Sequence, residues 1–516
     1  MVSGSSLRFV TLVVRAREDD LSIWCYNPQQ QKVHNYLYPS LLRCFLSGKS
    51  KVLLHTRNLS SGNPYVLYST LRNPSLVSRD RSSQIFQIAL PIIGGMMSQN
   101  ILNLVDAGMV SQLGEAELAA VGLASFVNFV AAAVFMGFSS GVQAMVARRI
   151  GEGKSSIAAN PLNGALLLIF LATIPTSYLL ISYSTEIISI LNNDPKVISE
   201  ATLYLDARLI GIMAIGMNFS FRGYLSAIKM TKFYFKTIVT MHIINVFLNY
   251  VLIFGNWGFP QLGTQGAGIG TTISMFGGTL MYLWLTMKHT KEYGFGAHLP
   301  KMETVKQLVK ISLPASMQQL FFALGFTFLF WIVGQIGTAE LAAANILTTL
   351  TLVAILPSIG FGMSAATLVG QALGRKEIED AYQWAWDTSK IAALSILSIS
   401  LPMLFMPDLI LSIFFENKAT IDLARLPLQI VAIAIIIDAY NLVLMSSLQG
   451  AGATKITMIV SIVCQWFIFL PLAWFIGPYM GMGLTAIWLT QGLYRLFQVF
   501  WFAALWHKKD WAKIKV

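Results

Sequence analysis

The chain has 516 residues, of which 55% are hydrophobic and only 12% are charged, and its mean hydropathy is +0.62. Soluble globular proteins carry about 25% charged residues, so this composition excludes that class and indicates a protein of the lipid bilayer. Cys25, Cys44 and Cys464 are too few and too far apart for a disulfide framework or a metal-ligand cluster. No Walker A sequence for nucleotide binding occurs.

Residues 1–84 are predicted to form a polar, poorly structured extension. They contain no apolar run long enough for a signal peptide. Residues 1–83 carry 11 Lys and Arg against 4 Asp and Glu, and no methionine lies between Met1 and Met96. Two explanations are open: a start codon assigned too far upstream, which we favour, or a basic targeting or regulatory segment.

From Ile85 onward the sequence predicts twelve membrane spans, because a span needs about 20 mainly apolar residues. The continuous apolar runs lack the alternation of a β-barrel strand and therefore indicate helices. The predicted spans are 85–110, 118–146, 161–183, 201–227, 235–255, 265–287, 307–333, 340–368, 389–412, 426–449, 456–476 and 482–505.

The loops between these spans give an orientation. One set of alternate loops, with the C-terminal tail, holds 19 Lys and Arg, whereas the other set holds only Lys196, Lys418 and Arg425. Positive residues stay on the cytoplasmic side, so both termini are predicted to be cytoplasmic in a multi-pass protein of the cytoplasmic membrane. The net charge of +12 is thereby explained without nucleic acid.

An internal repeat divides the spans into two halves. Residues 88–151 align without a gap to residues 311–374, at an offset of 223 positions. Matched features include Leu90-Pro91 with Leu313-Pro314, Gly137 with Gly360, and Gly151 with Gly374. An offset of six helices predicts an all-α fold of two six-helix lobes, related as a parallel repeat by a pseudo-two-fold axis along the membrane normal.

The predicted organisation of the chain therefore has four parts after the extension. These are an N-lobe over residues 85–290, a linker over 291–310 with the amphipathic start of span 7, a C-lobe over 311–505, and a basic cytoplasmic tail over 506–516.

Two acids, Asp106 and Asp438, lie well inside predicted spans, where an ionisable group needs a functional reason. Gln99, Asn103 and Asp106 share one helix face, as do Asn245 and Asn249. Carboxylate and amide oxygens suit Na⁺, and a carboxylate in an apolar cavity suits proton exchange, so both ions stay open. The alternative is that the amides only join helices through hydrogen bonds.

The chain resembles the multidrug and toxic compound extrusion family, in its bacterial NorM/DinF-like branch, over about residues 85–505. The likeness rests on the order of short motifs across the spans: Leu90-Pro91, Val105-Asp106, Leu113-Gly114, Leu118-Ala119-Ala120-Val121, Arg149, Gly151, Asn245, the run Asn249 to Gly255, Gly266-Ala267-Gly268, Asp438 and Leu448-Gln449-Gly450. The resemblance implies two lobes around a central cleft and export of drugs or metabolites, often cationic and amphipathic, driven by Na⁺ or H⁺.

The resemblance also implies site residues. Asp106, Asn245 and Asn249 match the family's N-lobe cation site, with Gln99 on the same face as Asp106 and with Thr271 and Tyr204 nearby. Where many relatives carry a second acid, this chain has Asn249, which favours H⁺ over a dedicated Na⁺ site.

In the C-lobe, Asp438 matches an acid of NorM-like members. The Glu that those members carry in span 7 is absent from residues 318–322, so a substrate-binding or packing role for Asp438 is equally open. Its neighbour Asn441 is placed to satisfy it.

Four further polar residues fall within or near the spans. Arg222 is expected to reach the cytoplasmic surface along its apolar stem, and Arg208 the outer one. Arg495 lies deeper without an evident partner, and His242 is expected to be a satisfied packing residue.

The predicted function is secondary active antiport of small organic compounds against H⁺ or Na⁺ by alternating access, by a monomer without a cofactor. No metal is expected beyond possible Na⁺ at Asp106. Two alternatives remain: a lipid-linked oligosaccharide flippase of the same superfamily, and a membrane-embedded transferase. A flippase would call for several arginines in the cavity, and an enzyme for clustered polar residues at one membrane face.

Overall fold

The computed structural model describes residues 77–297 and 300–516, together with the backbone of five short strands nearer the N-terminus. The chain divides into two units, Met1–Leu76 and Val77–Val516. The first contains a sheet of order β3-β2-β1-β4-β5. Its strands are β1 (Val10–Arg17), β2 (Asp20–Asn27), β3 (Lys32–Asn35), β4 (Val52–His55) and β5 (Val66–Leu67). The prediction for residues 1–84 otherwise falls largely outside the described residues.

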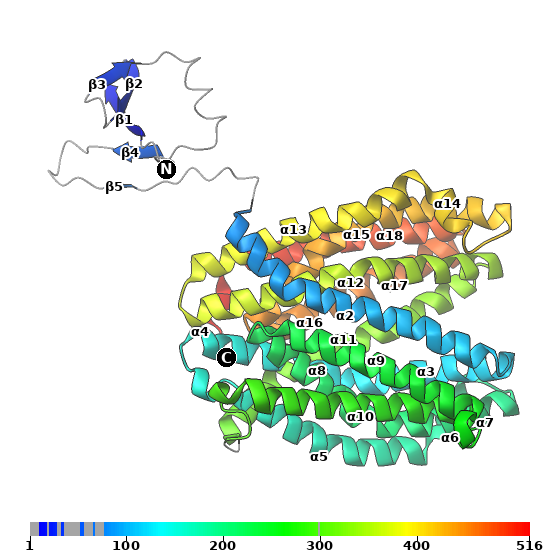
Figure 1. The fold of residues 1–516 in the computed structure, drawn as a ribbon. Helices are drawn as coiled ribbons and strands as arrows, with labels where there is room; N and C mark the ends of the chain where they lie inside the picture. The colour runs from blue at the N-terminus through cyan, green and yellow to red at the C-terminus, as the bar shows by residue number, and fades with distance from the viewer. Residues whose placement is uncertain are drawn as a thin grey trace, which may run out of the picture. The chain divides into compact units, whose positions relative to one another are not determined.

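The second unit is a helical bundle, drawn in Figure 1. Its first half runs through α2 (Arg79–Ser111), α3 (Glu115–Met136), α4 (Phe138–Gly151), α5 (Asn160–Ser182), α6 (Ser184–Leu191), α7 (Pro195–Ile210), α8 (Ile212–Ala227), α9 (Thr231–Phe254) and α10 (Gly263–His289), with short 3₁₀ turns η1 (Ser155–Ile157), η2 (Asn256–Gly258) and η3 (Lys291–Tyr293). Because α2 begins at Arg79, the bundle starts ahead of the predicted first span.

The second half repeats this plan. It runs through α11 (Met302–Gly334), α12 (Thr338–Gly374), α13 (Ile378–Phe405), α14 (Pro407–Leu411), α15 (Lys418–Gly450), α16 (Thr454–Ile462), the π-helical η4 (Val463–Phe469), α17 (Leu470–Trp474), the π-helical η5 (Phe475–Tyr479), α18 (Gly483–His507) and the 3₁₀ turn η6 (Asp510–Lys513). Pro471 and Pro478 lie at the two irregular stretches, where a missing backbone N–H disturbs the regular ladder.

Nine helical stretches within the described residues are long and apolar enough to cross a membrane. Three further stretches, α7 with α8, α10, and α18, coincide with the predicted spans 4, 6 and 12. The all-helical membrane bundle of twelve spans that the sequence predicted is therefore confirmed.

The repeat is visible in how the two lobes touch. A Cβ on Gly137 would lie 2.2 Å from the backbone nitrogen of Ser316, and a Cβ on its counterpart Gly360 would lie 2.5 Å from Cγ1 of Ile93. Ser316 and Ile93 are themselves related by the offset of 223. Both glycines thus let one lobe approach the other closely, and the two contacts are symmetrical.

Gly151 and Gly374, also related by the repeat, face each other. A Cβ on either would lie 2.8 or 2.7 Å from the Cα of the other. Residues related by a two-fold operation touch each other only near its axis, so the pseudo-two-fold axis passes between them. They lie at the end of the bundle where α2 begins and α18 ends, on the left in Figure 1, which we name the closed end.

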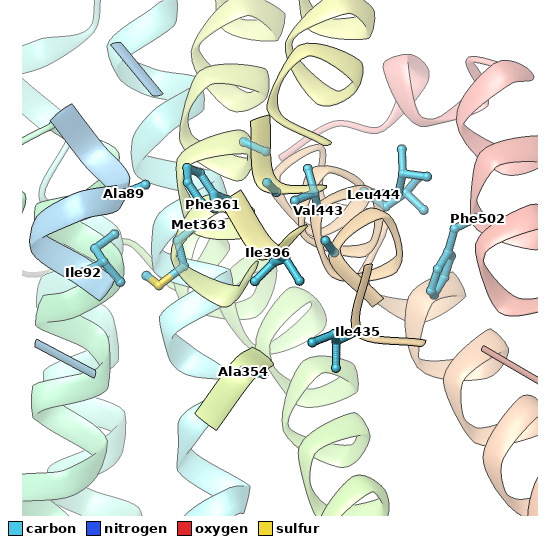
Figure 2. Packing of buried hydrophobic residues seen from close by; sticks show 14 of the residues in the cluster. Ala89, Ile92, Ala354, Phe361, Met363, Ile396, Ile435, Val443, Leu444 and Phe502 are labelled. Atoms are coloured by element: carbon cyan, nitrogen blue, oxygen red, sulfur yellow. The ribbon is translucent and has the colours of Figure 1, made fainter. Parts of the chain in front are cut away.

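Part of the contact between the lobes is small and apolar. Figure 2 shows Ala89 and Ile92 of α2 near Phe361 and Met363 of α12, and the cluster continues through α13 and α15 to Phe502 of α18. Lipid is as apolar as these side chains, so the helices are held by close van der Waals packing and hydrogen bonds rather than by the hydrophobic effect.

The C-terminal tail packs on the closed end. Trp511 is 2% exposed and stacks on Trp506 with ring centroids 4.0 Å apart. Arg148 Nη2 of α4 donates to the carbonyl oxygen of Ile514 at 3.3 Å, and Gln307 Nε2 of α11 donates to that of Lys515 at 2.8 Å. The tail therefore contacts both lobes.

Candidate functional site

Asp106, Asn249, Asn245 and Thr271 come together from three helices of the N-lobe. Asn249 Nδ2 of α9 donates to Asp106 Oδ1 of α2 at 2.9 Å and to Asn245 Oδ1, one turn earlier, at 3.2 Å. Asn245 Nδ2 donates to Thr271 Oγ1 of α10 at 3.0 Å, and Thr271 donates to the Ala267 carbonyl at 2.8 Å. These four residues, the N-lobe quartet, form one hydrogen-bonded chain that ends on the carboxylate.

One oxygen of the quartet lacks a hydrogen-bond donor. Asn249 Oδ1 is buried without a partner, and a buried acceptor in this state is costly. It packs where a Cβ on Gly270 of α10 would stand, 2.4 Å away, so Gly270 leaves the space that the amide occupies. Carboxylate and amide oxygens are hard ligands of the kind that a small cation accepts, although here the amide nitrogen of Asn249 faces Asp106 and its oxygen faces Gly270.

Gln99 belongs to a neighbouring group. Its Nε2 donates to Asn103 Oδ1 at 3.1 Å, as expected for one helix face. Its Oε1 lies 3.1 Å from His242 Nε2, and Ser98 Oγ lies 2.8 Å from His242 Nδ1. Both ring nitrogens of His242 are therefore occupied, as a packing histidine requires.

Tyr204 and Arg208 lie on α7. The Tyr204 hydroxyl accepts a hydrogen bond from Ser125 of α3 at 3.2 Å, and Arg208 approaches Met275 of α10, with Nη1 3.9 Å from Sδ. The expectation that Arg208 reaches the outer surface is wrong: it is 8% exposed, and its charge attracts that of Asp106.

Asp206 was missed. It lies in the predicted fourth span, and one of its carboxylate oxygens is buried without a hydrogen-bond partner. An acid inside an apolar run was the available signal.

In the C-lobe, Asp438 of α15 faces Arg495 of α18, with Oδ1 and Nε 3.3 Å apart. Arg495 is therefore paired with an acid, a pairing for which the sequence named no partner. The signal was present, because opposite charges inside membrane spans pair with one another. Asn441 donates from Nδ2 to Gln498 Oε1 at 3.1 Å, and Arg495 Nη1 donates to the same oxygen at 3.3 Å.

Glutamine side chains continue this polar cluster toward the N-lobe. Ser140 of α4 donates to Gln449 Oε1 at 3.2 Å, and Gln449 Nε2 donates to Gln318 Oε1 at 3.1 Å. Gln318 Nε2 donates to Ser461 Oγ at 2.9 Å, and Gln498 Nε2 donates to the same hydroxyl at 3.4 Å. An uncharged hydrogen-bonded path thus runs from one lobe across the other.

These residues line a cavity of about 170 Å³ between the lobes, with walls from α3, α4, α8, α11, α12, α15, α16, η4 and α18. Arg222 of α8 also lines it. The expectation that Arg222 extends to the membrane surface is therefore wrong, since its Nε is buried and its guanidinium lies 4.2 Å from the Phe219 ring centre. Its charge turns inward because the cavity is polar.

No group of three or more His, Cys, Asp or Glu placed to hold a metal ion occurs within residues 77–297 and 300–516.

A family model named MatE matches residues 91–251 and 314–475, which is more than half of the chain and one copy in each lobe. The chain belongs to the MatE family. The resemblance found in the sequence is thereby confirmed, and this MatE chain is a multi-pass membrane transporter rather than an enzyme.

Curated relatives of similar sequence are named as multidrug resistance proteins. The "Probable multidrug resistance protein NorM" of Thermotoga maritima is 24% identical over 455 residues, covering 86% of this chain and 97% of the relative. A protein of the same name from Synechococcus is 27% identical over 428 residues, covering 80% and 91%.

Solved structures share the fold. One described as the outward-facing conformation of a multidrug resistance MATE family transporter has a TM-score of 0.77 at 21% identity, covering 83% of this chain and 97% of that one. Another, a MOP superfamily transporter from Pyrococcus furiosus described as having a binding pocket of reverse polarity, has a TM-score of 0.76 at 21% identity, covering 84% of this chain and 97% of that one.

Proposed function

We propose that this protein is a secondary antiporter that exports small organic compounds in exchange for H⁺ or Na⁺ by alternating access. The multidrug resistance names of its relatives support the export of organic compounds. The N-lobe quartet carries the coupling part of the proposal, because its carboxylate and its unpartnered amide oxygen form an acceptor site inside a membrane lobe.

H⁺ is the favoured coupling ion. The quartet contains a single carboxylate, and the positive charge of Arg208 also acts on it. A Na⁺ ion would lose its hydration shell beside a guanidinium, whereas a proton binds directly to the carboxylate and converts it into a donor. Expectations of a cationic cargo and a monomeric state rest on the family resemblance alone.

Alternating access follows from the contacts between lobes. The contact between Gly151 and Gly374 lies at the closed end, which we take to be cytoplasmic from the distribution of Lys and Arg. The conformation is then outward-facing, with both termini cytoplasmic. A cation taken up at Asp106 from outside would favour cargo release, and opening of the closed end would return the cation to the cytoplasm.

The driving force is sufficient. One coupled charge gains about 2.3 kcal/mol per 100 mV of membrane potential, which corresponds to roughly 40-fold accumulation.

Everted vesicles test the proposal. With pH and Na⁺ gradients imposed separately, ethidium and a small organic anion are each followed as cargo. Asp106→Asn is expected to abolish gradient-driven transport at a normal membrane level, whereas Asp422→Asn, at a half-exposed acid of α15, is not. Undiminished transport by Asp106→Asn, or transport that requires ATP and no gradient, would refute the mechanism. Transport driven by the Na⁺ gradient alone would replace H⁺ with Na⁺.

A further inference from the structure

The charges of the cavity between the lobes determine which cargo it can hold. Among the described residues that line it, Arg222, Asp438 and Arg495 are the charged ones, and together they give a formal charge of +1. The remaining polar lining consists of amides and hydroxyls, which donate and accept equally well.

Asp438 is not available to an organic cation. Its carboxylate already faces Arg495 at 3.3 Å, and the two side chains are only 4% and 11% exposed. A cationic cargo that took over this carboxylate would leave Arg495 buried without its counter-charge and beside a second positive charge, and both effects oppose binding.

Arg222 is a cation without a counter-ion. Its side chain hydrogen-bonds to that of Tyr234 and lies near Tyr282, and its guanidinium packs against the Phe219 ring. These neutral partners leave its charge uncompensated and most of its five N–H donors unused. No carboxylate within the described residues pairs with it. A planar guanidinium with free donors matches a carboxylate or sulfonate, which it binds through two parallel hydrogen bonds.

We propose that the cavity binds a small, soluble organic molecule that carries one negative charge, and that Arg222 is the partner of this charge. The proposal rests on the proposed transport function and names its substrate class. It replaces the cationic cargo expected from the family resemblance.

The position of Arg222 links binding to movement. Arg222 lies on α8 of the N-lobe, whereas Gln318, Gln449 and Gln498 lie on helices of the C-lobe. A bound anion therefore contacts both lobes at once, and its arrival or departure changes the interactions that hold them together.

Equilibrium binding to the purified full-length protein tests the proposal without an ion gradient. The probes are radiolabelled p-aminohippurate, an organic monoanion, and tetraethylammonium, an organic cation. We expect p-aminohippurate to bind and tetraethylammonium not to bind. Arg222→Gln should weaken p-aminohippurate binding about 10- to 100-fold, as for loss of a hydrogen bond to a charged group. Arg222→Lys should retain much of it, and Arg425→Gln, at an exposed arginine of α15, should leave it unchanged.

A second variant keeps the test valid if Arg222→Gln does not fold. Gln319 lines the cavity and is exposed, so Gln319→Glu adds a negative charge without burying it and should also weaken p-aminohippurate binding. Binding of tetraethylammonium in place of p-aminohippurate, or p-aminohippurate binding that neither variant weakens, would overturn the proposal.

Two controls distinguish binding of a soluble anion from a loss of ion coupling and from binding of a lipid headgroup. Asp106→Asn should fail to transport p-aminohippurate while still binding it, although more weakly than the parent because a neutral side chain at this position favours cargo release; Arg222→Lys should retain both binding and transport, so loss of coupling and loss of binding are distinguishable. Transfer of a fluorescent anionic lipid between leaflets, with no binding of p-aminohippurate, would assign the cavity to a lipid headgroup and overturn the proposal of a soluble cargo.

Discussion

An ion-pair cluster joins the two lobes at the closed end, and its removal should open that end. Arg81 of α2 contacts Asp380 of α13, with Nη1 2.6 Å from Oδ1, and Asp387, with Nε 2.7 Å from Oδ2. Its guanidinium also lies 3.8 Å from the Trp384 ring centre. Since α2 belongs to one lobe and α13 to the other, Arg81→Gln leaves two carboxylates of the C-lobe without their partner in the N-lobe.

The size of the effect follows from burial. Removing one partner of a buried ion pair costs about 3–5 kcal/mol, and an exposed pair contributes about 0–1 kcal/mol. The Arg81 side chain is 11% exposed and its partners are 30% and 15% exposed, so screening by solvent places the cost between these limits. We expect a cost of about 2 kcal/mol. This cost shifts the equilibrium between contacting and separated lobes roughly 30-fold toward the separated state at this end.

A cysteine reporter measures this shift. Ser364 of α12 is buried at the contact between lobes and donates to the Ile85 carbonyl of α2 at 3.2 Å. With the three native cysteines replaced, a cysteine introduced by Ser364→Cys should react with a polar maleimide only when the lobes separate. Arg81→Gln should raise the rate of this reaction in proportion to the shift.

Arg375→Gln is the matched control. Arg375 contacts the same Asp380 at 3.3 Å and also Glu377, but it is 42% exposed and both partners lie on its own lobe. Its replacement removes an equal charge without separating the lobes. Equal labelling rates for the parent, Arg81→Gln and Arg375→Gln would show that the cluster does not hold the closed end.

Two glycine substitutions test packing at the other sites. Gly270→Ala would place a methyl group 2.4 Å from Asn249 Oδ1. Displacement of this amide should abolish gradient-driven transport, although the protein still reaches the membrane. Gly277→Ala on the same helix, where the nearest atom to the new methyl group is 4.0 Å away, should remain active. Gly374→Ala overpacks the contact on the pseudo-two-fold axis and should destabilise the closed end by about 1–3 kcal/mol, which would appear as faster maleimide labelling and a lower Tm in detergent. Gly122→Ala, where no atom lies within 4 Å of the new methyl group, should change neither the labelling rate nor the Tm. Equal labelling rates and equal Tm values for the two variants would contradict the axis contact.

The helices and their pairing by repeat were predictable because their signals are carried by the chain itself. Continuous apolar runs give spans, and the gapless offset of 223 relates Gly137 to Gly360 and Gly151 to Gly374. The structure adds that these glycines touch the opposite lobe. A sequence shows that a position requires a small residue, but it does not show which neighbour imposes that requirement.

The N-lobe quartet was predictable only in part. Helical spacing places Asn245 and Asn249 on one face, but only the resemblance brought them to Asp106 and added Thr271. Within one helix, side-chain directions are fixed by periodicity, whereas contacts between helices depend on rotation and tilt. For the same reason Arg208 and Arg222 were assigned to the surface: a long side chain can turn either way, and the polar environment that attracts it belongs to other helices.

The repeat fixes the scaffold and leaves the two lobes chemically different. The equivalence between the lobes extends to contacts. In the N-lobe His242 contacts Gln99. Their counterparts in the C-lobe, Gln465 and Phe322, also touch, because Gln465 donates to the carbonyl oxygen of Phe322 at 3.5 Å. Three residues further on, however, Asn245 corresponds to Ile468. A symmetrical contact between lobes suits a rocking motion, because both halves can tilt away from the axis in the same way when the closed end opens. In the mechanism that we propose, the acceptor site is confined to one lobe, so that the cation and the cargo in the cavity occupy different places. The coupling between them must then pass through the position of the lobes rather than through competition for one carboxylate.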